Sequence, residues 1–131
     1  MTSIQSTQFN DAARNYLSRL NSAFSSEIMK SVEILCEYLS DAWKERRQVF
    51  ICGNGGSAAN AIHIANDLHY GIGACGSPPM IPGMRVEALP ANTGVITCLA
   101  NDTGYENIYS EQLIAKANRD DILIALSGSG N

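Results

Sequence analysis

Two short glycine- and serine-rich segments are the parts of this sequence best suited to binding an anion. The first is Gly53-Asn54-Gly55-Gly56-Ser57, and the second is Ser127-Gly128-Ser129-Gly130-Asn131. Glycines let the backbone approach an anion closely, while serine hydroxyls and the N–H groups at a helix start donate hydrogen bonds to it. We therefore expect the two segments to bind a phosphate monoester. The alternative for the first segment is a simple tight turn in which Ser57 caps a helix.

The glycine spacing differs from that of two common nucleotide-binding loops. A Walker loop would continue with Gly-Lys-Ser or Gly-Lys-Thr, which is not found after this segment. The dinucleotide fingerprint GxGxxG does not fit Gly53, Gly55 and Gly56 either. Both kinds of nucleotide loop are therefore excluded here.

His63 and Asp67 follow the first segment at a separation of four residues. On a helix this spacing places both side chains on one face, where they could share a metal ion. Asp67 could alternatively serve as a general acid or base. The simpler interpretation is an exposed ion pair. Two ligands do not complete a zinc site, which normally needs three or four. His69 would point elsewhere on the helix, so we interpret His69 as structural.

A second polar group, Asn101-Asp102-Thr103-Gly104, follows an apolar run at residues 95–99 that we interpret as a strand. If that run is a strand, Asn101 and Asp102 lie at the same edge of the sheet as the glycine-rich segments. Their amide and carboxylate groups would suit hydrogen bonds to sugar hydroxyls. Asparagine and aspartate are also ordinary turn and cap residues, and Asn54 has the same two interpretations.

The elements that would position these residues alternate between strand and helix. Apolar runs predict strands, hydrophobic spacing predicts helices, and glycine with proline predicts a loop. The strands are expected at residues 48–52, 86–89, 95–99 and 121–126, the helices at 58–70 and 105–117, and the loop at 71–84. Such alternation is typical of an α/β fold with a parallel sheet, in which ligands bind at the carboxyl ends of the strands.

Residues 10–47 have a helical pattern with a long apolar stripe. A break is expected at Asn21-Ser22 or at Ser25-Ser26, so the segment is one long helix or two in succession. The stripe would cover the sheet or pack between subunits. It consists of Phe24, Ile28, Val32, Leu35, Leu39 and Trp43.

Composition limits the remaining possibilities. The chain has 131 residues, 45% hydrophobic and 17% charged, which is typical of one globular domain and not of a disordered chain. A net charge of −4 disfavours nucleic acid as a partner. We expect no membrane partner, signal peptide or CxxC metal motif. The expected location is the cytoplasm, with Cys52 and Cys98 as small buried apolar residues.

Three runs, residues 52–68, 98–105 and 126–131, together resemble the SIS (sugar isomerase) domain, specifically its phosphoheptose isomerase branch. The resemblance implies a flavodoxin-like α/β/α sandwich with a parallel sheet. Residues 1–131 would form a single SIS domain, with a helical segment at 1–47 and the α/β core at 48–131. The branch further implies a homotetramer.

The activity implied by the resemblance is conversion of sedoheptulose 7-phosphate to D-glycero-D-manno-heptose 7-phosphate. Proton transfer through an enediol would carry the reaction, which supplies ADP- or GDP-heptose for surface polysaccharide such as lipopolysaccharide. Asp67 would be the acid/base, and His63 with Asp67 would hold part of a zinc site, with one ion per subunit. The implied substrate-binding residues are Asn54, Gly55, Gly56, Ser57, Asp67, Asn101, Asp102, Ser127, Gly128 and Ser129.

The sequence departs from the family pattern in two places. Asp67 stands where the family has glutamate, and the C-terminal helix that carries a glutamine and a histidine of the zinc site has no counterpart. We therefore expect the chain to represent the first part of a domain of roughly 190 residues. The alternatives are a non-catalytic SIS module that binds a sugar phosphate or a replication initiator, and a fragment with no activity of its own.

Overall fold

The computed structural model describes residues 3–71 and 82–130. The chain forms two compact units, Met1–Tyr38 and Leu39–Asn131. The division falls within helix α2 (Ser26–Lys44), and each unit is considered by itself. Within the described residues, no helix has the length and apolar character needed to cross a membrane.

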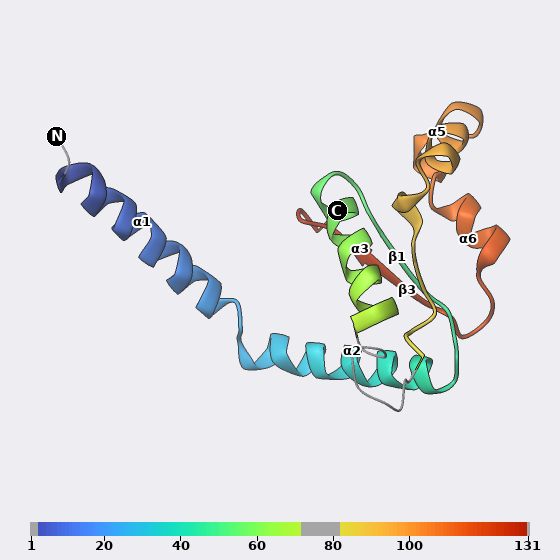
Figure 1. The fold of residues 1–131 in the computed structure, drawn as a ribbon, viewed down its shortest axis with the longest axis horizontal. Coiled ribbons are helices and arrows are strands. Elements are labelled where there is room, and N and C mark those ends of the chain that lie inside the picture. The colour runs from blue at the N-terminus through green and yellow to red at the C-terminus, as the bar shows by residue number, and fades with distance from the viewer. Residues whose placement is uncertain (1–2, 72–81, 131) are drawn as a thin grey trace. The chain divides into compact units, whose positions relative to one another are not determined.

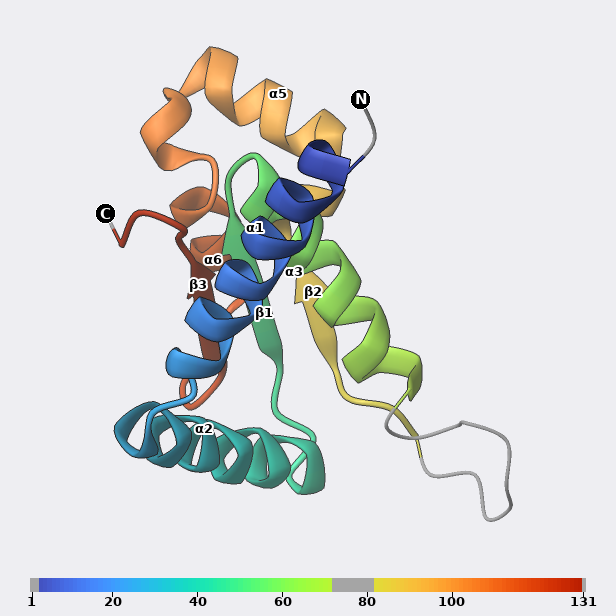
Figure 2. The same cartoon turned by 90° about the vertical axis from the view of Figure 1, so that its left-hand side faces the viewer.

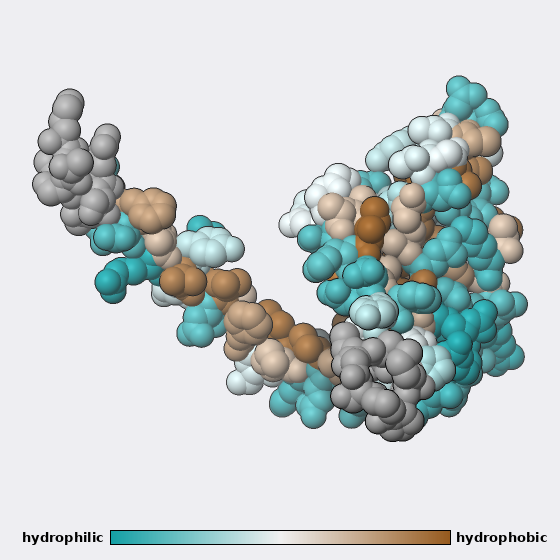
Figure 3. Space-filling model, viewed as in Figure 1, coloured by the Kyte–Doolittle hydropathy of each residue, from teal (hydrophilic) through white to brown (hydrophobic). Residues whose placement is uncertain are grey.

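The first unit consists of α1 (Ser3–Ser22) and the larger part of α2. The expected break is present, because the Ser25 hydroxyl accepts a hydrogen bond from the Ile28 N–H at 3.3 Å and so caps α2. Apolar side chains are exposed along both helices, as the brown surface in Figure 3 shows. They are Phe9, Tyr16, Leu17, Leu20, Phe24, Ile28, Met29, Val32, Ile34, Leu35 and Tyr38.

The second unit is built on a parallel sheet with the strand order β2-β1-β3. The strands are β1 (Val49–Gly53), β2 (Val86–Ala88) and β3 (Ile122–Leu126). Each outer strand pairs with β1 in parallel orientation, as Figures 1 and 2 show. The predicted parallel sheet is confirmed, and so are the strands expected near residues 48–52, 86–89 and 121–126.

Successive residues of β1 face opposite sides of the sheet, and both sides are covered. Val49 and Ile51 pack against α3 (Gly56–Asn66) and the end of α2, through Ala42, Ala61 and Ala65. On the other side, Phe50 and Cys52 pack with Leu89, Tyr109 and Leu113, the last of which lies in α6 (Ser110–Lys116). Helix, sheet and helix thus form the expected layers of an α/β/α sandwich.

Both predicted core helices are present, but each is divided into two parts. After β1, α3 ends at Asn66 and continues as a π-helical turn, η1 (Asp67–Gly71). The predicted helix at 105–117 is divided into a 3₁₀ turn, η3 (Tyr105–Asn107), and α6. Most of the loop expected at 71–84, residues 72–81, lies outside the described residues.

The strand predicted at residues 95–99 is wrong, since these residues lie in helix α5 (Thr93–Asp102). The side chain of Asn92 caps this helix by accepting a hydrogen bond from the Val95 N–H at 3.1 Å. Cap and tertiary context therefore outweigh the strand preference of the β-branched residues. Cys98 is consequently exposed, not buried as expected, whereas Cys52 is buried as predicted.

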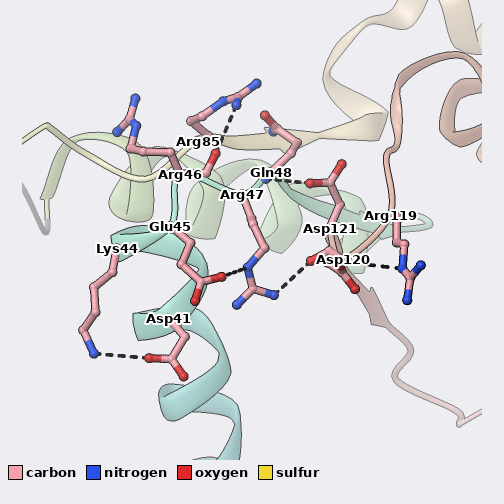
Figure 4. A network of polar contacts seen from close by, with 10 residues as sticks. All are labelled: Asp41, Lys44, Glu45, Arg46, Arg47, Gln48, Arg85, Arg119, Asp120 and Asp121. Atoms are coloured by element: carbon pink, nitrogen blue, oxygen red, sulfur yellow. Dashed lines mark hydrogen bonds and ion pairs between the residues drawn. The ribbon is translucent and has the colours of Figure 1, made fainter.

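Polar contacts tie the end of α2 to the amino ends of the strands (Figure 4). The Asp121 carboxylate accepts hydrogen bonds from the backbone N–H groups of Gln48 at 2.9 Å and Asn118 at 2.7 Å. Arg47 forms an ion pair with Glu45 at 3.0 Å, and its guanidinium donates to the carbonyl of residue 120 at 2.9 Å. These contacts hold β1 and β3 in register from the edge opposite to the glycine-rich segments.

The core around β1 can be tested directly by truncating one of its buried side chains. Phe50 is 2% exposed, so Phe50→Ala should lower the free energy of unfolding by about 3–5 kcal/mol through lost burial and a residual cavity. The control is Ile114→Ala, because Ile114 is 77% exposed and its truncation should change stability by no more than about 0.5 kcal/mol. Urea denaturation measures both, and equal losses would contradict the assigned core.

Candidate active site

The pairing of Gly53 with Leu126 across β1 and β3 brings the two glycine-rich segments side by side. Both segments leave the sheet at the carboxyl ends of their strands, as expected for a ligand site in a parallel sheet. A cleft of about 350 Å³ lies between them. Its lining consists of Cys52, Gly53, Asn54, Ser57, Tyr109, Ala125, Leu126, Ser127, Gly128 and Ser129.

The first segment needs glycine at two positions for different reasons. A Cβ on Gly53 would lie 2.7 Å from the Cβ of Ser57 and 2.9 Å from the carbonyl oxygen of Leu126. Gly55 has φ 56° and ψ −122°, a conformation that residues with a side chain rarely adopt. The tight turn that results starts α3 beside the cleft, where the positive end of the helix dipole favours an anion.

The second segment is held by a hydrogen bond within itself. The backbone N–H of Gly130, which has φ 79°, donates to the Ser127 hydroxyl oxygen at 2.9 Å. A Cβ at Gly128 would have no neighbour within 4 Å, so the backbone there is open to a ligand. Ser127 and Gly128 also line a neighbouring hollow of about 480 Å³ on the α3 side, which they share with Ser57 and His63. The loops thus connect the cleft with the helix that carries His63.

His63 and Asp67 lie together, as their spacing predicts. The distance from His63 Nε2 to Asp67 Oδ2 is 3.5 Å, and the side chains are 77% and 61% exposed. In a tetrahedral zinc site with bonds of about 2.0–2.2 Å, neighbouring ligand atoms are roughly 3.3–3.5 Å apart. The pair therefore fits two corners of such a site. In the part of the chain that the structure describes, no third His, Cys, Asp or Glu joins them in a cluster.

Asn101 and Asp102 occupy the last turn of α5 and line neither hollow. Asn101 Nδ2 donates to Asp102 Oδ1 at 2.7 Å, and the thiol of Cys98 lies 3.4 Å from the other carboxylate oxygen. These two donors hold the pKa of Asp102 below its ordinary value. Because residues 95–99 are helical, the pair does not leave the sheet directly from a strand, contrary to the expectation.

Tyr109 was not predicted as a site residue, but it precedes α6 and lines the cleft. Its hydroxyl donates to the carbonyl oxygen of Gly53 at 2.5 Å and lies 3.1 Å from Asn54 Oδ1. Burial is the main cause that raises the pKa of Tyr109, and burial also raises that of the Cys52 thiol. No local signal could have identified the contact, since 56 residues separate Tyr109 from Gly53.

Comparison with known protein families agrees with this architecture. Residues 8–131 match the SIS domain, which is nearly the whole chain. The chain belongs to the SIS domain family. The family resemblance stated from the sequence motifs is therefore confirmed.

Phosphoheptose isomerases are among the proteins similar to this SIS domain chain. It is 37% identical over 120 residues to that of Campylobacter concisus, covering 90% of this chain and 61% of the relative. It is 44% identical over 84 residues to that of Rhodospirillum rubrum, covering 64% of this chain and 42% of that relative. The solved phosphoheptose isomerase structure from Neisseria gonorrhoeae aligns with a TM-score of 0.69 and 25% identity, covering 98% of this chain and 63% of that one. The chain thus spans about two-fifths to three-fifths of the length of these proteins.

The turn of the first segment can be tested through its two adjacent glycines. Gly55→Ala forces a side chain into the conformation at φ 56° and should cost about 1–3 kcal/mol of stability. Gly56→Ala is the matched control, because Gly56 begins α3 without a positive φ and a Cβ there meets nothing within 4 Å. The control should be neutral or stabilising by up to about 1 kcal/mol. Thermal and urea unfolding measure both variants, and equal effects would refute the strained turn.

Proposed function

We propose that the protein carrying this sequence is a ketose–aldose isomerase of sugar phosphates, with sedoheptulose 7-phosphate as substrate and D-glycero-D-manno-heptose 7-phosphate as product. The observation that carries the proposal is the cleft between the two glycine- and serine-rich segments together with the adjoining hollow that His63 lines. The His63 imidazole lies 3.5 Å from the Asp67 carboxylate. The names of the similar phosphoheptose isomerases support the choice of substrate.

The phosphate group would bind between the two segments. Ser57 and Ser127 line both hollows and Ser129 lines the cleft, so hydroxyl groups from two strand ends can donate to the same anion. The start of α3 adds a favourable dipole at this position. Two anchoring points on one rigid sheet would fix the sugar chain, so that its reacting carbons come near the histidine–carboxylate pair.

Asp67 would move the proton. Interconversion of a ketose and an aldose requires a base that takes a proton from one carbon and returns it to the neighbouring carbon. The Asp67 carboxylate is exposed and lies 3.5 Å from the His63 imidazole, which would orient it. That Asn101 and Asp102 form hydrogen bonds with sugar hydroxyls remains a prediction. The lowered pKa keeps Asp102 ionised at neutral pH and so able to accept hydrogen bonds.

His63 and Asp67 would also hold a zinc ion, since their 3.5 Å separation suits two ligands of one ion. When bound, zinc would act as a Lewis acid toward the substrate oxygens. The remaining proposals from the sequence concern the whole protein: a homotetramer, a cytoplasmic location and a role in heptose supply for surface polysaccharide. The exposed apolar faces of α1 and α2 support an oligomer.

Replacement of Asp67 tests the proposed chemistry. Asp67→Asn keeps the size of the side chain and removes its basicity, so turnover of sedoheptulose 7-phosphate should fall by about 100-fold or more. The matched control is Asp41→Asn, because Asp41 is an exposed aspartate paired with Lys44 at 3.2 Å on α2. The control should keep its activity within about twofold. Product formation is measured by a coupled assay or by NMR.

The same experiment separates the proposed enzyme from its alternatives. Full turnover in Asp67→Asn would remove Asp67 from the mechanism. Binding of sedoheptulose 7-phosphate without any turnover in the unaltered protein would favour a non-catalytic SIS module, and capture of a replication initiator would support that alternative further. If the unaltered protein neither binds nor converts sedoheptulose 7-phosphate, the result would favour an inactive fragment.

The zinc proposal has its own test. His63→Ala should weaken zinc binding by about tenfold or more, because it removes a ligand atom. His69→Ala is the control, since His69 is six residues away from His63 in the sequence and lies in η1. Competition with a fluorescent chelator measures the affinity independently of turnover. Equal zinc affinities in the two variants would contradict the assignment of His63.

A further inference from the structure

The contact between Tyr109 and the first glycine-rich segment has a consequence for how Asn54 meets a ligand. Tyr109 reaches the segment from the connection before α6. Its hydroxyl lies 2.5 Å from the Gly53 carbonyl oxygen and 3.1 Å from the amide oxygen, Oδ1, of Asn54. Its ring packs against the cluster of Phe50, Cys52 and Leu89 beneath the cleft. The hydroxyl is therefore held in place by apolar packing as well as by hydrogen bonds.

A tyrosine hydroxyl has a single proton to donate. The short distance to the Gly53 carbonyl shows where that proton goes, because a carbonyl oxygen can only accept. Burial raises the pKa of Tyr109, so the hydroxyl keeps its proton at neutral pH. Toward Asn54 the hydroxyl oxygen can then only accept a hydrogen bond.

The side chain of Asn54 ends in an oxygen and an NH₂ group of nearly the same size and shape, and hydrogen bonding decides which one faces a given partner. An amide oxygen 3.1 Å from a hydroxyl oxygen that has already used its proton would place two acceptors together. Rotation of the amide by 180° instead places the NH₂ group against Tyr109. The amide oxygen then points away from Tyr109, and Asn54 lines the cleft.

We propose that Tyr109 is a positioning residue that turns the amide of Asn54 so that its oxygen, not its NH₂ group, is offered to the ligand. Asn54 then accepts a hydrogen bond from a sugar hydroxyl and does not donate one to the phosphate. Phosphate recognition is left to the serines, and Asn54 selects for a hydroxylated chain. The choice of a sugar phosphate as ligand rests on the proposed function, whereas the orientation of the amide does not.

The amide orientation is tested by NMR of the side-chain NH₂ group of Asn54 in the full chain. Tyr109→Phe removes the hydroxyl and keeps the ring in the Phe50 cluster. The Asn54 NH₂ resonances should move and their protons should exchange faster with water, because their acceptor is gone. Tyr70→Phe is the control, since Tyr70 is 61% exposed and lies in η1. Unchanged Asn54 resonances in Tyr109→Phe would overturn the proposal.

Calorimetry with two probes tests the consequence for binding. Tyr109→Phe should weaken binding of sedoheptulose 7-phosphate by about fivefold, the value of one ordinary hydrogen bond, and leave binding of inorganic phosphate within about twofold. In an Asn54→Ala background, Tyr109→Phe should have no further effect on sugar-phosphate binding. An equal weakening of both probes, or the same effect in both backgrounds, would indicate a merely structural role and overturn the proposal.

These outcomes separate the inference from the proposed function. If neither probe binds but the Asn54 resonances respond to Tyr109→Phe, the proposed function fails and the positioning role stands. If the sugar phosphate binds and turns over normally in Tyr109→Phe while the resonances are unchanged, the positioning role fails and the function stands.

Discussion

The parallel pairing of Gly53 with Leu126 is the constraint on which the site depends. It brings the strand ends together at the carboxyl edge, and it leaves no room for a side chain on Gly53, whose Cβ would meet Ser57 and the Leu126 carbonyl. The tight turn, the start of α3 and the cleft follow from this close approach. At the opposite edge, the Asp121 carboxylate accepts a hydrogen bond from the backbone N–H of Gln48, and this contact helps to hold the same register.

The two faces of β1 connect the core with the site. Val49 and Ile51 anchor the layer that contains α3, and α3 carries His63, which lines the hollow next to the cleft. Phe50 and Cys52 anchor the other layer, and with it Tyr109, whose hydroxyl holds the Gly53 carbonyl. The residues of the candidate site therefore come from both sides of one buried strand, and the packing of that strand sets their geometry.

Most of the architecture could be predicted because it is encoded locally. Apolar runs at 48–52 and 121–126 are strong signals for strands. The glycines that directly follow the first run are a strong signal for a turn and a helix start. The strand expected at 95–99 failed for a local reason as well: β-branched residues favour strands, but the Asn92 cap and the surrounding structure produce α5. Because the strand was wrong, the positions expected for Cys98, Asn101 and Asp102 were wrong too.

By itself, the sequence determined the SIS motifs, the parallel α/β class and the adjacency of His63 and Asp67, because each depends on spacing within one or two neighbouring elements. The tertiary structure alone decided that Tyr109 contacts Gly53 across 56 residues of chain. Contacts of this kind arise when separate layers pack on the same strand, and no local pattern of residue types encodes them.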